Sequence, residues 1–153
     1  MKKLRIAIIA FCLIASIVLF LSSKFRDDPN RNGLWLVPPI VVQCTDSPAS
    51  LEQIETALDW WKERGENFQG PVHGKCEGDH PPAGFIWISG SEVKGHSEMA
   101  STTWYVRGHT REILWARVRI FEMNERVLEH EIGHAVGWKH QNRFDHLMNQ
   151  DYL

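Results

Sequence analysis

The sequence predicts an α+β fold, in which a mixed, twisted sheet is covered by one backing helix and by one helix that carries a metal-binding motif. Segments rich in β-branched and aromatic residues alternate with two segments of helical periodicity. Their order is strand, helix, several strands, helix and an irregular tail. The chain has 153 residues, 43% hydrophobic and 24% charged, which is typical of one globular domain following an N-terminal apolar stretch.

The N-terminal residues 1–25 are predicted to form a targeting or anchoring segment. Basic residues near the N-terminus precede an apolar run at 6–21, which is longer than most signal-peptide cores and slightly shorter than a typical membrane span. Because residues 21–23 lack a small-x-small cleavage pattern, a single-pass membrane anchor is favoured over a cleaved signal. Both alternatives predict export. A charged linker is expected at 26–36 and the globular domain at 37–153.

The first half of the domain predicts two strands with a helix between them. Residues 40–43 are short and β-branched, which favours a strand, and a second strand is expected at 68–72 before a loop rich in Gly and Pro. Ser47 is predicted to be the N-cap of the helix, with Pro48 in its first turn. Gly65 ends the helix, whose apolar face consists of Leu51, Ile54, Leu58 and Trp61.

The second half predicts three more strands and a second helix. The strands are expected at 85–88, 102–106 and 113–121, and the last of them alternates so that Ala116, Val118 and Ile120 share a buried face. Asn124 is predicted to cap the second helix, and Gly137 to end it. The apolar side of this helix comprises Val127, Leu128, Ile132, Ala135 and Val136.

Charge and cysteine usage limit the function class and the compartment. The formal net charge is -2 with neutral histidines, so the chain lacks the basic balance of a nucleic-acid-binding protein, and no nucleic-acid partner is expected. Cys44 and Cys76 are the cysteines outside the apolar run. In an exported domain this pair favours one disulfide, worth about 3–4 kcal/mol for a loop of that length. Two free, buried thiols are the alternative.

The second helix contains HEIGHAVGWKH, at positions 130–140. Residues four apart on a helix share a face, so His130 and His134 can present two imidazoles to one ion. Gly137 allows the chain to leave the helix and return His140 to the same ion. Three nitrogen ligands leave one tetrahedral position open, which is typical of a catalytic zinc. Glu131 is adjacent, and can act as the general base for a metal-activated water that hydrolyses a peptide bond.

This motif resembles the elongated zinc signature of the metzincin metalloproteases, and HLMN at 146–149 resembles their Met-turn. The resemblance covers residues 127–149. It implies an endopeptidase with one catalytic Zn²⁺, with Met148 beneath the metal. It further implies that an edge strand binds the peptide or protein substrate in extended form. Residues 100–104 are the candidate edge strand, and an ordinary sheet strand is the alternative.

Several residues have weaker assignments. Some metzincin subfamilies carry a tyrosine two positions after the methionine of the Met-turn, and this chain has none there. Tyr152 lies nearby and is the candidate to contact a reaction intermediate. Little sequence follows, so a minimal C-terminal subdomain is expected. Asp145 and Asn142 are candidates to orient a ligating imidazole. A second, structural zinc is considered for four further histidines, for which exposed positions are the favoured alternative: His73, His80, His96 and His109.

The expected function is that of a zinc endopeptidase outside the cytoplasm, membrane-anchored through the N-terminal segment or secreted. The alternative is a non-catalytic, zinc-dependent binding protein of the cell envelope. Glu131 favours the enzyme, because a protein that only holds a metal does not need this carboxylate. An intramembrane protease is excluded, because the motif lies among charged residues and not within an apolar span.

Overall fold

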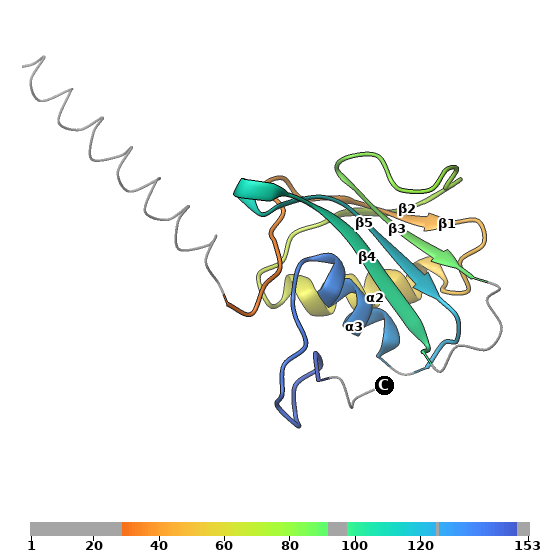
Figure 1. The fold of residues 1–153 in the computed structure, drawn as a ribbon. Helices are drawn as coiled ribbons and strands as arrows, with labels where there is room; N and C mark the ends of the chain where they lie inside the picture. Colours follow the sequence, from red (N-terminus) through yellow and green to blue (C-terminus); the bar gives the residue numbers. More distant parts are fainter. Residues whose placement is uncertain (1–28, 92–97, 125, 150–153) are drawn as a thin grey trace, which may run out of the picture.

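The computed structural model describes residues 29–91, 98–124 and 126–149, and these residues form an α+β fold (Figure 1). The predicted fold class and the predicted order of strands and helices are confirmed. Tyr152 and His96 lie outside the described residues. In chain order the elements are β1 (Ile40–Cys44), α2 (Leu51–Lys62), β2 (Gln69–Gly74), β3 (Phe85–Gly90), β4 (Ala100–Arg107), the 3-10 turn η1 (Gly108–Thr110), β5 (Glu112–Ile120) and α3 (Val127–Ala135).

The strands form one mixed, five-stranded sheet in the order β2-β1-β3-β5-β4. β1 runs parallel to β2 and β3, and β3 runs parallel to β5. β4 is antiparallel to β5, to which it is connected through η1, and it occupies one edge of the sheet. The candidate edge strand at 100–104 is therefore at an edge.

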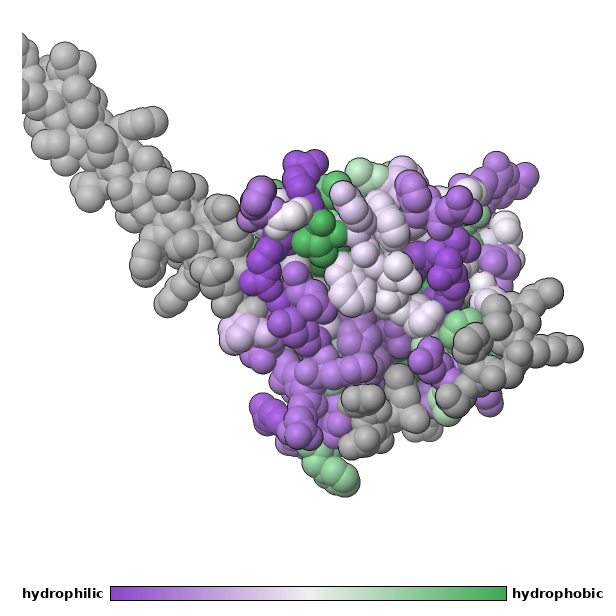
Figure 2. Space-filling model, in the orientation of Figure 1, coloured by the Kyte–Doolittle hydropathy of each residue, from purple (hydrophilic) through white to green (hydrophobic). Residues whose placement is uncertain are grey.

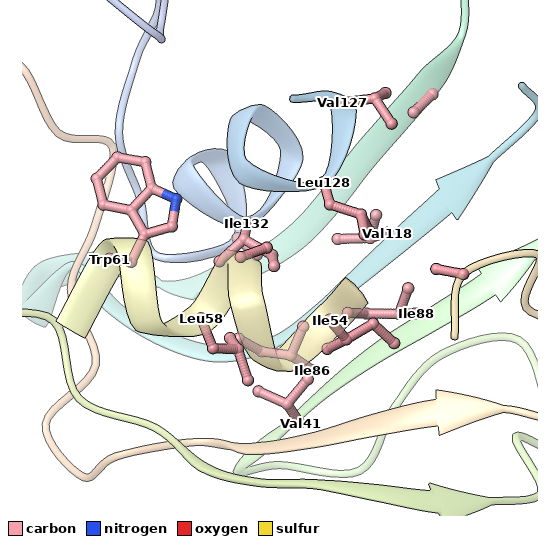
Figure 3. Close-up of a cluster of buried hydrophobic side chains, with 14 of the residues drawn as sticks. Val41, Ile54, Leu58, Trp61, Ile86, Ile88, Val118, Val127, Leu128 and Ile132 are labelled. Atoms are coloured by element: carbon pink, nitrogen blue, oxygen red, sulfur yellow. The ribbon is translucent and has the colours of Figure 1, made fainter. Parts of the chain in front are cut away.

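The hydrophobic core lies between the sheet and the two helices, which cover the same face of the sheet (Figure 1). Figure 3 shows side chains of α2 and α3 meeting those of β1, β3 and β5. The predicted alternation along β5 is confirmed, because Ala116, Val118 and Ile120 are at most 1% exposed. The helices are also linked by a hydrogen bond of 2.6 Å from Trp61 Nε1 to the carbonyl of Glu129.

Helix α2 begins three residues later than predicted. Ser50, and not Ser47, is the N-cap, because Ser50 and Gln53 form a capping box with reciprocal hydrogen bonds of 3.1 and 2.8 Å. Ser47 instead accepts a hydrogen bond from the backbone N–H of Ala49. The later start leaves Leu51 in the first turn, 39% exposed, while Ala57 joins the buried face.

Helix α3 also begins later than predicted, and Asn124 is not its N-cap. The N-cap is Arg126, with a left-handed φ of 69° and no side-chain capping bond. The Asn124 amide instead donates to the sulfur of Met99, at 2.6 Å. The predicted apolar side is confirmed, since its five residues are at most 4% exposed.

Cys44 and Cys76 form a disulfide, with their Cα atoms 5.4 Å apart, as favoured from the sequence. The bridge joins the end of β1 to the loop after β2. Replacing both residues with Ala is expected to lower the free energy of unfolding by about 3–4 kcal/mol, because the unfolded chain regains the freedom of the closed loop. Urea unfolding of both proteins checks this, with reduced wild type as control. Equal stability of the oxidised wild type and the variant would contradict it.

The prediction of a single-pass membrane anchor is corrected. Within residues 29–91, 98–124 and 126–149, no helix is long and apolar enough to cross a bilayer. The longest described helix, α2, has 12 residues and extends about 18 Å, against about 30 Å for a hydrocarbon core. The segment at 1–25 lies outside the described residues. The disulfide is compatible with export.

Residues 29–34, within the stretch predicted to be a linker, contact two parts of the domain; we call them the N-terminal strap. On one side, Leu34 exchanges backbone hydrogen bonds with Arg111 and Ile113, of 3.0 and 2.8 Å, at the start of β5. On the other side, Arg31 forms an isolated antiparallel bridge with Trp138, in the turn that follows α3. The strap therefore lies between β5 and this turn.

Candidate metal centre

Three histidine side chains converge at the end of α3. His130 and His134 lie one turn apart on this helix. Gly137, at φ 97°, then reverses the chain so that His140 returns toward them. The Nε2 atoms are 3.1 Å apart between His130 and His134, 3.0 Å between His134 and His140, and 3.2 Å between His130 and His140. The three residues form a group that could hold a metal ion.

The spacing and the protonation of these nitrogens fit one cation. Four ligands at about 2.05 Å around a tetrahedral zinc are separated from one another by about 3.3 Å, close to the observed distances. Nδ1 of His130 and Nδ1 of His134 each face a backbone carbonyl, so both Nδ1 atoms must carry the proton. Their Nε2 atoms are then unprotonated and would repel at 3.1 Å unless a cation lies between them.

Backbone carbonyls orient two of the three imidazoles. Nδ1 of His130 donates to the carbonyl of Leu147 at 2.8 Å, and Nδ1 of His134 donates to the carbonyl of Trp138 at 2.8 Å. Such contacts fix ring orientation and tautomer. The sequence-based candidates for this role, Asp145 and Asn142, do not fill it; Asp145 forms an exposed ion pair with Arg143. The sequence could not identify these two acceptors, because every residue has a backbone carbonyl.

The histidine pKa values favour the neutral form that binds metals. Burial lowers the pKa of His134 to about 4; the Trp138 carbonyl partly opposes this shift, and the neighbouring histidines reinforce it. Burial also lowers the pKa of His130, against the effect of the Leu147 carbonyl. Both rings are therefore mainly neutral at pH 7, which is the form in which an imidazole nitrogen can bind a metal.

Glu131 lies beside the histidine group and is tied to the edge strand. It is 4% exposed. The hydroxyl of Thr102, on β4, donates to Glu131 Oε2 and lies 3.1 Å from its main-chain oxygen. Burial raises the pKa of Glu131 to about 7, while the Thr102 hydrogen bond lowers it and the Glu98 charge raises it. Sequence analysis missed the role of Thr102, although it placed this residue in the candidate edge strand.

An open cleft of about 630 Å³ exposes the histidine group. β4 contributes Ala100, Thr102 and Trp104 to its lining, and Asn32 of the strap and Lys139 line it as well. On the face shown in Figure 2, the described surface is mostly hydrophilic, with only isolated hydrophobic side chains. The cleft thus offers an extended strand edge next to a group of potential metal ligands.

The HLMN segment packs against α3 beside the two helical histidines. Met148 is fully buried, and a Cβ on Gly133 would lie 2.4 Å from its sulfur. The backbone N–H of Met148 donates to Nδ1 of His146 at 3.1 Å. Gly133, between the two helical histidines, therefore has to lack a side chain for Met148 to occupy this position.

The remaining described histidines do not form a second site. Among residues 29–91, 98–124 and 126–149, the group at 130, 134 and 140 is the one set of three or more His, Cys, Asp or Glu that converges closely. His73 is instead 3.1 Å from Gln43 Oε1, and His80 stacks on Trp115 at a centroid distance of 5.1 Å. The structural zinc considered from the sequence is not supported by the described part of the chain.

No protein-family model, curated protein or solved structure matches the chain. Any functional assignment therefore rests on the sequence motif and on the geometry described above.

Proposed function

We propose that this protein is a zinc-dependent endopeptidase with a metzincin-type catalytic domain. The observation that carries the proposal is the convergence of three Nε2 atoms next to a buried carboxylate, in a cleft walled by an edge strand. The resemblance of the motif at 130–140, and of HLMN, to metzincin sequences supports the same reading. Zinc is the favoured ion because imidazole suits it and three protein ligands are typical of its catalytic sites.

Bound zinc would supply a Lewis acid that polarises a peptide carbonyl and lowers the pKa of water to near 7. In the proposed reaction, Glu131 takes a proton from water as the water oxygen bonds to the carbonyl carbon. It passes that proton to the amide nitrogen as the C–N bond breaks. The main chain of β4 pairs with the substrate peptide, placing it in extended form along the cleft. No covalent intermediate with the protein is required.

The test of this proposal is a peptide-library digest by the zinc-loaded full chain. Cleavage that stops on chelation and returns with zinc is expected. Stoichiometric zinc binding without cleavage of any peptide would contradict the peptidase and favour the non-catalytic zinc-dependent binding protein.

Thr102→Val is expected to lower kcat about tenfold to hundredfold with little change in KM, because a hydrogen bond to a charged group is worth about 1.5–3 kcal/mol. Thr102 is a positioning residue in this proposal, since it holds one carboxylate oxygen of Glu131 and leaves the other to act. Thr102→Ser is expected to restore activity. Steady-state kinetics on a cleaved library peptide measures these effects.

The matched control is Thr103→Val, one position along β4, where the side chain is exposed. Its kcat is expected to equal that of wild type. Wild-type kcat in Thr102→Val, or an equal loss in Thr103→Val, would argue against the positioning role.

A further inference from the structure

The turn that carries His140 is held by the N-terminal strap through backbone pairing. The N–H of Asn32 donates to the carbonyl of Gly137 at 2.7 Å, and the N–H of Lys139 donates to the carbonyl of Asn30 at 2.8 Å. The approach is close enough that a Cβ on Gly137 would lie 2.1 Å from the carbonyl oxygen of Gly33. The strap therefore fixes the backbone conformation of this turn.

A cluster of three side chains reinforces this pairing. The Glu66 carboxylate, with its side chain 13% exposed, accepts hydrogen bonds from the Arg31 guanidinium and, at 3.0 Å, from Trp138 Nε1. The Arg31 guanidinium also lies 4.1 Å above the Trp138 ring. Trp138 stacks with Trp61 of α2 at a centroid distance of 6.1 Å. Glu66 thus joins the strap to the turn while both pack on the core.

Trp138 connects this cluster to two of the three metal-binding histidines. Its carbonyl is the acceptor that fixes Nδ1 of His134. His140 follows two residues later on the same turn. A shift of Trp138 would therefore rotate one imidazole and displace another, although none of Arg31, Glu66 and Trp138 contributes a ligand nitrogen to the group.

We propose that the strap, through the Arg31–Glu66–Trp138 cluster, positions His134 and His140 and thereby sets the metal affinity of the centre. Arg31, Glu66 and Trp138 are positioning residues for the metal. The inference requires that the three histidines bind zinc, and it does not require that the protein cleaves peptides. It differs from a purely structural role, in which the cluster would contribute to folding stability and leave zinc affinity unchanged.

The test is zinc affinity of the full chain, measured by competition with a chromophoric chelator. Glu66→Ala removes the shared acceptor and is expected to raise the zinc Kd roughly tenfold to hundredfold, the usual effect of losing a residue that orients ligands. Trp138→Phe keeps the aromatic ring but removes its N–H donor, and is expected to raise the Kd by less.

Val42→Ala is the control. It leaves a cavity in the smaller core cluster of Val42, Cys44 and Trp87. The zinc Kd of this variant is expected to stay within about twofold of wild type, because Val42 contacts no metal ligand and no group that orients one.

A second measurement needs no metal. Amide hydrogen exchange at Asn32 and Lys139 in the zinc-free protein is expected to accelerate in Glu66→Ala and Trp138→Phe, and to be unchanged in Val42→Ala. The inference would be overturned if folded Glu66→Ala bound zinc with wild-type affinity, or if Val42→Ala lost zinc affinity to a comparable extent. If Glu66→Ala does not fold, the zinc affinity of Trp138→Phe is judged by the same criteria. A wild type that binds zinc but cuts no peptide contradicts the proposed peptidase alone.

Discussion

Glu131→Gln is expected to bind zinc as wild type does while peptide hydrolysis falls by roughly 10²–10⁴-fold, the usual contribution of a general base. The amide keeps the size of the side chain and can still accept the Thr102 hydroxyl, but it cannot take a proton from water. The three imidazoles are unchanged, so the metal should remain. Zinc content of the purified protein and kcat on a library peptide give the two readouts.

Glu129→Gln is the matched control for this experiment. Glu129 lies on the same helix two residues earlier and does not line the cleft. Its activity is expected to equal that of wild type. Cleavage that persists in Glu131→Gln with zinc bound would contradict the assignment of Glu131 as the general base, but it would not contradict the assignment of the three histidines as metal ligands.

His134→Ala is expected to raise the zinc Kd by at least about a hundredfold and to abolish hydrolysis. Structural zinc sites with four protein ligands are worth about 10–16 kcal/mol, so a single ligand accounts for about 3 kcal/mol. The same loss should appear as a smaller rise of Tm on adding zinc, because binding to the folded state stabilises it. Chelator competition and thermal unfolding, each with and without zinc, measure both effects.

The control here is His73→Ala, at an exposed position on β2, the opposite edge of the sheet from β4. This variant should bind zinc and respond to it as wild type does. If His134→Ala retained the zinc affinity of wild type, the three histidines would not be the metal site.

The strands and helices could be predicted because their periodicity reflects burial. β5 alternates since one face meets the helices, and α3 repeats at helical spacing since one side meets the core. The helix starts could not be read with the same reliability. Ser47 and Ser50 are both acceptable N-caps of α2, and Ser50 takes this role because it forms reciprocal hydrogen bonds with Gln53. Asn124 does not cap α3 because its amide donates to Met99, a contact that depends on tertiary structure.

The histidine group was predictable because its geometry is local to one helix and one glycine turn. Residues four apart meet on a helix whatever the rest of the fold does, and Gly137 indicates where the chain can reverse. The contacts that hold the group depend on other parts of the fold, except for the bond from His134 to the carbonyl of Trp138, four residues away. Thr102 reaches Glu131 through the position of β4 beside α3, and the carbonyls of Leu147 and Trp138 have no sequence signature.

The strap contacts also bear on when the metal centre can form during folding. Lys139 Nζ donates to the carbonyl of Pro29 at 3.0 Å, and Trp35 Nε1 donates to the carbonyl of Ala135 at 2.9 Å, so segments at least 100 residues apart in the sequence meet beside the histidine group. Contacts between such distant segments are slow to form, because a long loop must close first. Tight zinc binding should therefore coincide with the late step of folding in which the N-terminal segment docks on the end of α3 and the turn that follows it.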